Sequence, residues 1–236
     1  MIQFYSPDIT RTLELPEDES QHCVRVLRMK EGDEINVIDG KGKRYLCEIE
    51  NADPRHTKLR ILSEEDSSVP RNYSLTIAIA PTKNADRIEW LVEKAVEIGV
   101  DRIVLLKCRR SERKILRKDR LEKIMISAMK QSLGVTLPTL DDMVDFKQYV
   151  EETDLKSQKF FGYCSETVGK SSFVKECKPG GEVIVMIGPE GDFTQEEVKL
   201  AIEKGFKAVT FGEKRLRTET AGVFAICAVN VINQLL

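Results

Sequence analysis

The sequence is poor in histidine and aromatic residues, and its cysteines are scattered. It has 236 residues, of which aromatic residues make up 6%, and only two histidines, His22 and His56. No two cysteines have the C-x-x-C spacing of zinc and dithiol motifs. We therefore expect no metal site and mostly buried, reduced thiols. A catalytic cysteine would need His22 or His56 as its base. The cysteines are Cys23, Cys47, Cys108, Cys164, Cys177 and Cys227.

Long apolar runs and a large net charge are also absent. Runs such as Val183–Ile187 are far shorter than the roughly 20 residues of a membrane helix. The first ten residues lack the basic and apolar regions of a signal peptide. With 41% hydrophobic residues and a net charge of −2, the chain is not expected to be disordered. These absences predict a globular, cytoplasmic protein with no membrane partner.

One stretch departs from the overall balance of charge. Lys107–Arg120 holds eight basic residues against two acidic ones. Such a run is usually a solvated surface, and the alternative is a patch that binds RNA or another polyphosphate. The run alone does not distinguish these two interpretations.

The first seventy residues have the pattern of a small β domain. Strand-like runs at 35–38 and 44–49 flank Asp39-Gly40-Lys41-Gly42, and Asp-Gly between two such runs predicts a hairpin. Residues 57–62 alternate apolar and polar, as in a half-buried strand. Several short strands joined by tight turns predict a barrel. The polar residues 64–72, which include a proline, predict a domain boundary.

Beyond Asn72 the pattern changes to alternating strands and helices, which predicts an α/β domain with a mainly parallel sheet. Thr194 with Glu197 three residues later is a capping-box pattern at a helix start. Strands are expected at 75–80, 103–106, 160–163, 183–187 and 208–211, and helices at 86–99, 119–131, 194–204 and 220–236. The last of these helices is apolar around most of its circumference, so it must be covered on more than one side.

Two loops carry the candidate chemistry, and each follows a strand and precedes a helix. In open α/β sheets this is where ligands bind. The first, IGPEGDFT at 187–194, is neither a dinucleotide fingerprint nor a P-loop. The second, FGEKRLRTETA at 211–221, places three cations near a helix start, which suits an anionic ligand. The alternative interpretation is that Thr218 or Thr220 only caps that helix and that the cations are only exposed to solvent.

Together these loops resemble the GPEGG-F and LG-x-RILR-x-ETA signatures of the small-subunit (16S) ribosomal RNA uracil-N3 methyltransferase family, which belongs to the knotted SPOUT methyltransferases. The resemblance covers the whole chain, because HCVRVLR at 22–28 and KAVEIGV at 94–100 also resemble segments of that family. Three positions depart from the family pattern. Asp192 replaces a second glycine, Lys214-Arg215 replaces Arg-Ile, and Gly134 stands where arginine is common.

The resemblance implies a fold and a cofactor. Residues 1–68 would form a PUA-like RNA-binding β-barrel, and residues 73–236 a SPOUT domain whose backbone makes a deep trefoil knot. The knot would hold S-adenosylmethionine through Ile187, Gly188, Pro189, Gly191, Phe211, Gly212, Leu216 and Arg217.

The implied reaction is methylation of N3 of a uridine in 16S ribosomal RNA, within the small subunit, by a homodimer that needs no metal. Arg217 is the candidate for stabilising negative charge on the uracil, and Glu190 or Glu219 for accepting the N3 proton. Both glutamates are explained equally well as helix-start residues. A SPOUT enzyme acting on transfer RNA or another RNA base remains an alternative, as does a non-catalytic RNA-binding factor in ribosome assembly.

Basic residues of both predicted domains are the candidates for RNA contacts. In the barrel they fall in one short segment suited to phosphates or an unpaired base. In the α/β domain they belong to the basic run. The candidates are His22, Arg25, Arg28, Lys30, Arg109 and Arg110.

Overall fold

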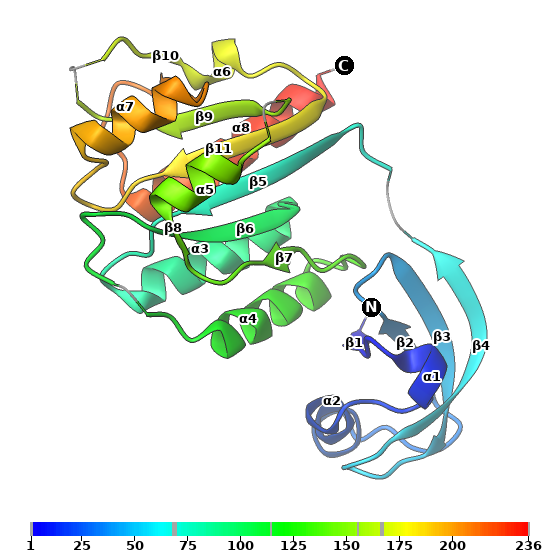
Figure 1. The fold of residues 1–236 in the computed structure, drawn as a ribbon. Helices are drawn as coiled ribbons and strands as arrows, with labels where there is room; N and C mark the ends of the chain where they lie inside the picture. Colours follow the sequence, from blue (N-terminus) through cyan, green and yellow to red (C-terminus); the bar gives the residue numbers. More distant parts are fainter. Residues whose placement is uncertain (1, 68–69, 114, 155, 166–167, 236) are drawn as a thin grey trace. The chain divides into compact units, whose positions relative to one another are not determined.

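The chain forms two compact units in this computed structural model, which describes residues 2–67, 70–113, 115–154, 156–165 and 168–235 (Figure 1). The first unit is Met1–Pro70 with Ile126–Leu137, and the second is Arg71–Met125 with Pro138–Leu236. The predicted domain limits at residues 1, 68 and 236 lie outside the described residues. Among the described helices, none combines the length and the apolar character needed to cross a membrane.

The first unit is built on a four-stranded sheet of order β1-β2-β3-β4. β1 is parallel to β2, and β2–β3 and β3–β4 are antiparallel. The predicted hairpin is confirmed, and Asp39 Oδ1 accepts hydrogen bonds from the Lys41 and Lys43 amides at 2.7 and 3.1 Å. The strands are β1 (Gln3–Tyr5), β2 (Glu34–Ile38), β3 (Lys43–Asn51) and β4 (Lys58–Asp66).

The polar stretch 64–72 is not a linker throughout, because residues 64–66 belong to β4. Their backbones pair with Lys43–Tyr45 of β3, and this pairing requires no apolar side chains. The side chains of residues 63–66 are exposed, which explains their polar sequence. Residues 13–15 pair with the other end of β4, where the Leu59 amide donates to the Leu13 carbonyl at 2.8 Å.

Three short helical segments pack against this sheet, and the sequence pattern did not predict them. They are α1 (Ile9–Thr12), α2 (Glu17–Gln21) and a π-helix at His22–Val26. Ile9, Leu15 and Cys23 are buried in the core of this unit. The rest of that core comes from β1 to β4, at Phe4, Ile35, Val37, Tyr45, Cys47, Ile49 and Leu59.

Residues 126–137 also belong to the first unit, although they lie far along the chain. The Gln3 side-chain amide donates to the Gly134 carbonyl at 2.9 Å, and the Gly42 amide donates to the Val135 carbonyl at 3.0 Å. Lys130 Nζ lies 2.6 Å from a carboxylate oxygen of Glu19. Gly134, one of the departures from the motif pattern that the sequence resembles, therefore contributes through its backbone.

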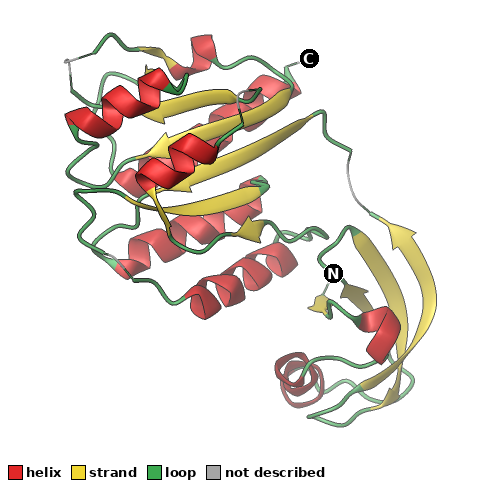
Figure 2. Ribbon diagram, in the orientation of Figure 1, coloured by secondary structure: helices red, strands yellow, loops and turns green. Residues whose placement is uncertain are grey.

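The second unit confirms the predicted α/β domain with a parallel sheet (Figure 2). The strand order is β10-β12-β9-β11-β5-β6-β7, and every pairing is parallel. In addition, β8 pairs with the last two residues of β6, Leu106 and Lys107. The very short strands β7, β8 and β10 were not predicted. The strands are β5 (Tyr73–Ile79), β6 (Arg102–Lys107), β7 (Thr139–Leu140), β8 (Val144–Asp145), β9 (Gln158–Gly162), β10 (Ser171–Ser172), β11 (Gly181–Ile187) and β12 (Lys207–Thr210).

Helices cover both faces of this sheet. α3 and α8 pack together on one face, and α5 and α7 lie on the other (Figure 1). A Cβ atom on Gly222 of α8 would lie 2.4 Å from Leu91 Cδ1 of α3, so the close approach of these two helices requires a glycine there. The helices are α3 (Ala85–Ile98), α4 (Lys118–Gln131, whose residues from Ile126 onward belong to the first unit), α5 (Phe146–Glu152), α6 (Phe173–Glu176), α7 (Gln195–Glu203) and α8 (Thr218–Gln234).

Candidate active site

Three neighbouring strands of the second unit end at the same edge of the sheet. β9 pairs with β11 on one side and β12 on the other, and Gly162 is the register partner of both Ile187 and Val209. Because all three strands are parallel, the loops that follow them converge. Two of these loops are the ones that the sequence singled out. The third, after β9, became visible only with the strand order.

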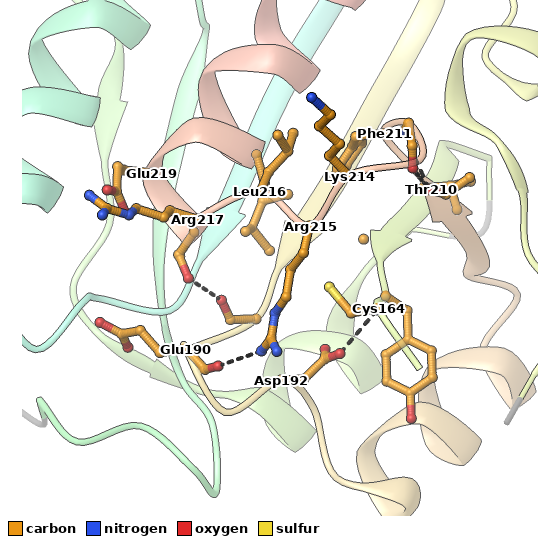
Figure 3. A pocket seen from close by; sticks show the side chains of 18 of the residues that line it. Cys164, Glu190, Asp192, Thr210, Phe211, Lys214, Arg215, Leu216, Arg217 and Glu219 are labelled. Atoms are coloured by element: carbon orange, nitrogen blue, oxygen red, sulfur yellow. Dashed lines mark hydrogen bonds between the residues drawn. The ribbon is translucent and has the colours of Figure 1, made fainter. Parts of the chain in front are cut away.

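The three loops enclose a cavity of about 860 Å³. It is lined by nearly all the predicted cofactor residues, namely Ile187, Gly188, Pro189, Phe211, Gly212, Leu216 and Arg217. Gly191 is exposed and does not line it. The candidate catalytic residues Glu190 and Glu219 do line it, and Figure 3 shows them with Arg217 at this site.

Two glycines shape the wall of this cavity. Gly212 has a φ of 136°, in the region that favours glycine, and an added Cβ would meet no atom within 4 Å. Gly162 instead provides room for a ring, because a Cβ there would lie 2.5 Å from Phe211 Cε2. Backbone atoms of the loops therefore face open space that a side chain at Gly212 would occupy.

The start of α8 is held differently from the prediction. Arg217 occupies the N-cap position and makes no side-chain cap hydrogen bond, so the alternative in which Thr218 or Thr220 caps the helix is not what the structure shows. Thr218 is the first helical residue, and its hydroxyl donates to the Gly188 carbonyl at 3.2 Å. This bond fastens the loop after β12 to the end of β11. The predicted capping box at Thr194 and Glu197 is confirmed at the start of α7.

Asp192, the departure from the family glycine, has a φ of 61°. Aspartate is one of the few residues with a side chain that tolerate this left-handed conformation. Its carboxylate accepts a hydrogen bond from the Cys164 amide at 3.0 Å, which joins the loops after β9 and β11. Partial desolvation of the sulfur and, to a smaller extent, the Asp192 charge raise the pKa of the Cys164 thiol.

The charged groups of the cavity differ in how they are partnered. Among the described residues, the Arg217 guanidinium has no hydrogen-bond or ion-pair partner, and the side chain is exposed. Glu219 is 7% exposed, and its Oε1 lies 3.8 Å from Nε of Arg87 in the first turn of α3. Its other carboxylate oxygen is buried, with no hydrogen-bond partner in the described part of the chain. Arg87 was not predicted from the sequence.

Glu190 lies at the exposed end of the loop after β11. Its Oε1 accepts a hydrogen bond from the Lys83 amide at 2.9 Å, and its carbonyl accepts one from Arg215 at 3.2 Å (Figure 3). Glu190 is therefore oriented by the loop after β5 and remains open to solvent.

Two arginines of the basic run, Arg110 and Arg113, hold the loops after β11 and β5 in place. Nη1 of Arg110 donates to the carbonyls of Gly191 and Phe193 at 2.7 and 3.4 Å. Arg113 donates to the carbonyls of Thr82 and Lys83 at 3.1 and 2.6 Å. The Arg109 side chain has no such partner among the described residues, although its amide donates to Glu197. Lys114 lies outside the described residues.

The remaining candidates for RNA contacts lie in the first unit, on and just after the π-helix. Arg25, Arg28 and Lys30 are exposed, and the His22 ring lies 6.1 Å from that of Phe4. The neighbouring Cys23 is fully buried, and burial with the charges of Asp33 and Glu19 raises the pKa of its thiol to about 11. A thiol with that pKa is not a nucleophile at neutral pH, which argues against a catalytic Cys23–His22 pair.

The structure also adds cavity residues that sequence reasoning missed. Tyr163 and Cys164 follow β9, Lys170 directly precedes β10, and Ser172 is the last residue of β10. The strand order brings them to the site. No pattern in the sequence carried that order.

Matches to known protein families show the class of protein to which this chain belongs. Residues 69–230 match the RNA methyltransferase domain family, and residues 15–62 match the RNA methyltransferase PUA domain. The ribosomal RNA small subunit methyltransferase E of Aquifex aeolicus is 32% identical over 231 residues, which cover 93% of this chain and 95% of that protein.

Solved structures agree in fold over nearly the full length. A protein of Porphyromonas gingivalis described as a probable rRNA-methyltransferase has a TM-score of 0.95 at 39% identity, covering 100% of this chain and 99% of its own. The ribosomal RNA small subunit methyltransferase E of Neisseria gonorrhoeae, solved with S-adenosylmethionine, has a TM-score of 0.85 at 29% identity and 98% coverage of both chains. The chain belongs to the ribosomal RNA small subunit methyltransferase E family.

Proposed function

We propose that this protein transfers the methyl group of S-adenosylmethionine to N3 of a uridine in small-subunit ribosomal RNA. The observation that carries the proposal is the convergence of the loops after β9, β11 and β12 on one cavity, lined by the residues that match the family motifs. Family membership supports the substrate class. Titration calorimetry with S-adenosylmethionine tests the first step, because a non-catalytic RNA-binding factor would show no heat of binding.

The cavity fits this cofactor on its own evidence. The positive φ of Gly212 leaves open space beside the backbone, and a cavity of about 860 Å³ lies within the roughly 300–1,000 Å³ of small-molecule sites. When bound, S-adenosylmethionine supplies an electrophilic methyl group. It would be held by main-chain groups of Ile187, Gly188, Phe211, Gly212 and Leu216, in a pocket closed by the Thr218–Gly188 hydrogen bond.

The protein's part in the reaction is to handle charge and one proton. Uracil N3 carries a proton at neutral pH and must lose it, which leaves negative charge on O2 and O4. Among the described residues, Arg217 is one of the exposed cations at the cavity that have no hydrogen-bond or ion-pair partner, and it is assigned to stabilise that charge. Glu190 is assigned to accept the proton, because its carboxylate is exposed at the cavity and is oriented by the Lys83 amide.

The surroundings of Glu219 suit a structural role better than proton transfer. Its Oε1 faces Arg87, and its Oε2 is buried away from any approaching base. At the second position of α8, its carboxylate lies at the positive end of the helix dipole. Glu219 is therefore assigned to position Arg87 and the helix start, and it is not the preferred proton acceptor.

A deep knot and a homodimer complete the proposed architecture. The fastening of the loop after β12 to the end of β11 supports a knotted pocket. The outer side of α8 supports a dimer, because Val223, Phe224 and Cys227 are half-buried and Val231 is 52% exposed. A row of apolar side chains along one helix face is typical of a partner contact.

Light scattering at micromolar protein is expected to give the mass of two chains. Val231→Asp places a charge on the outer side of α8 and is expected to give monomers. Ile202→Asp, at a 46% exposed position on α7, is the matched control and should leave the dimer intact. A monomer mass for the unaltered protein would contradict the dimer.

Arg110→Ala is expected to weaken S-adenosylmethionine binding about tenfold, because it removes the charged donor to two loop carbonyls. RNA affinity should stay unchanged, because this guanidinium is already engaged. Arg110→Lys should recover part of the affinity, and Arg109→Ala, whose side chain is not engaged, should leave cofactor binding as it is. Calorimetry and RNA titration measure the two affinities. Loss of RNA binding alone in Arg110→Ala would return this residue to an RNA-contact role.

A further inference from the structure

The first unit carries a second hollow, of about 470 Å³, beside the π-helix. Its apolar part is formed by Val24, Met29 and Ala52, which pack against the core of that unit. Its polar part is formed by Arg28, Lys30 and Glu31. The hollow therefore combines an apolar floor, two cations and one hydrogen-bond acceptor.

The backbone beside this hollow takes two uncommon conformations within a few residues. His22–Val26 is a π-helix, and Arg28 has a φ of 57°. π-Helices are rare and frequently occur at functional sites, and the left-handed conformation is unfavourable for a residue with a long side chain. The Met29 amide is still satisfied, by the Cys23 carbonyl at 3.1 Å. This segment keeps Arg28 and Met29 at the hollow despite its conformational cost.

The cations at the hollow are available for a ligand. Among the described residues, Arg25, Arg28 and Lys30 make no side-chain hydrogen bond or ion pair, and all three are exposed. Elsewhere in the same unit, Arg60 pairs with Glu48 at 2.8 Å, and Lys43 pairs with Glu64. Unpaired cations are the groups that bind the phosphate backbone of single-stranded nucleic acid, and here they adjoin an apolar floor against which a base can lie.

We propose that this hollow receives the base of one unpaired RNA nucleotide. The base would lie against Val24, Met29 and Ala52, its N–H edge would donate to Glu31, and the flanking phosphates would lie beside Arg28 and Lys30. Proteins recognise RNA largely through such unstacked bases. The inference rests on the proposed function for the identity of the ligand as RNA, and it names a docking nucleotide separate from the methylated uridine.

The test measures the affinity of the full-length protein for a short single-stranded RNA of mixed sequence, by fluorescence anisotropy over a range of salt. Ala52→Leu fills the hollow without changing charge, and is expected to weaken binding about tenfold or more with an unchanged salt slope. Arg28→Ala with Lys30→Ala should lower the slope of log K against log salt by up to about 1.4, or about 0.7 per phosphate. Arg60→Ala, whose side chain is already paired, is the control and should bind RNA normally.

Wild-type affinity for RNA in a folded Ala52→Leu protein would overturn the proposal, and so would equal competition by poly-glutamate, which would indicate a general anion site. Photo-crosslinking of RNA that contains 4-thiouridine needs no variant. Adducts within residues 24–31 or at residue 52 are expected, and adducts only elsewhere would contradict the hollow. Methylation of ribosomal RNA by the unaltered protein is measured separately, so failure of the docking site and failure of the proposed function give different results.

Discussion

Arg217→Ala is expected to lower the rate of methyl transfer at saturating RNA by about 100-fold or more, because its proposed partner is negative charge that develops on the uracil during the reaction. Its affinity for RNA should change little. Arg217 has no competing partner among the described residues, so the loss should not come from a broken structural contact. Single-turnover rates at saturating RNA measure this directly, since docking defects disappear at saturation and chemical defects do not.

The matched comparison is Arg25→Ala with Arg28→Ala in the first unit. That double variant should weaken RNA binding and flatten its salt dependence, while its saturated rate stays close to that of the wild type. A saturated rate for Arg217→Ala equal to the wild type would remove Arg217 from catalysis. A joint loss of cofactor affinity and rate would instead make it a residue that orders the start of α8.

Gly212→Val is expected to abolish the rise in melting temperature that S-adenosylmethionine produces. The ligand stabilises only the folded state to which it binds. The substitution places a branched side chain in the open space beside the loop, at a φ of 136° that valine rarely adopts. Thermal unfolding with and without the cofactor measures the shift.

Gly169→Val serves as the control for this substitution. An added Cβ at Gly169 also meets no atom within 4 Å, but its φ is not in the left-handed region and it does not line the cavity. Its cofactor-induced shift should match the wild type. An undiminished shift in Gly212→Val would show that the cofactor binds elsewhere.

The sequence predicts local structure well where a short pattern contains the whole cause. The hairpin at Asp39–Gly42 depends on an Asp-Gly turn, and the start of α7 depends on Thr194 with Glu197. Both are confirmed. Residues 64–66 show why a polar stretch does not always indicate a linker. An edge strand with exposed side chains still pairs through its backbone.

The parts of the site that could not be predicted depend on contacts between distant segments. The order β12-β9-β11 brings Cys164 to Asp192, and no periodicity contains strand order. Thr218 looked like a helix cap until the structure placed the Gly188 carbonyl within its reach. The basic run was ambiguous for the same reason, since Arg110 is committed to carbonyls 81 residues or more away in the sequence.

Methylation of N3 of a uridine in small-subunit ribosomal RNA is tested most directly by nucleoside mass spectrometry of that RNA. The RNA is taken from cells with the gene, without it, and complemented with the wild type or Arg217→Ala. We expect 3-methyluridine to be present with the gene, lost without it, restored by the wild type and strongly reduced with Arg217→Ala. Unchanged 3-methyluridine in cells that lack the gene would contradict the claim.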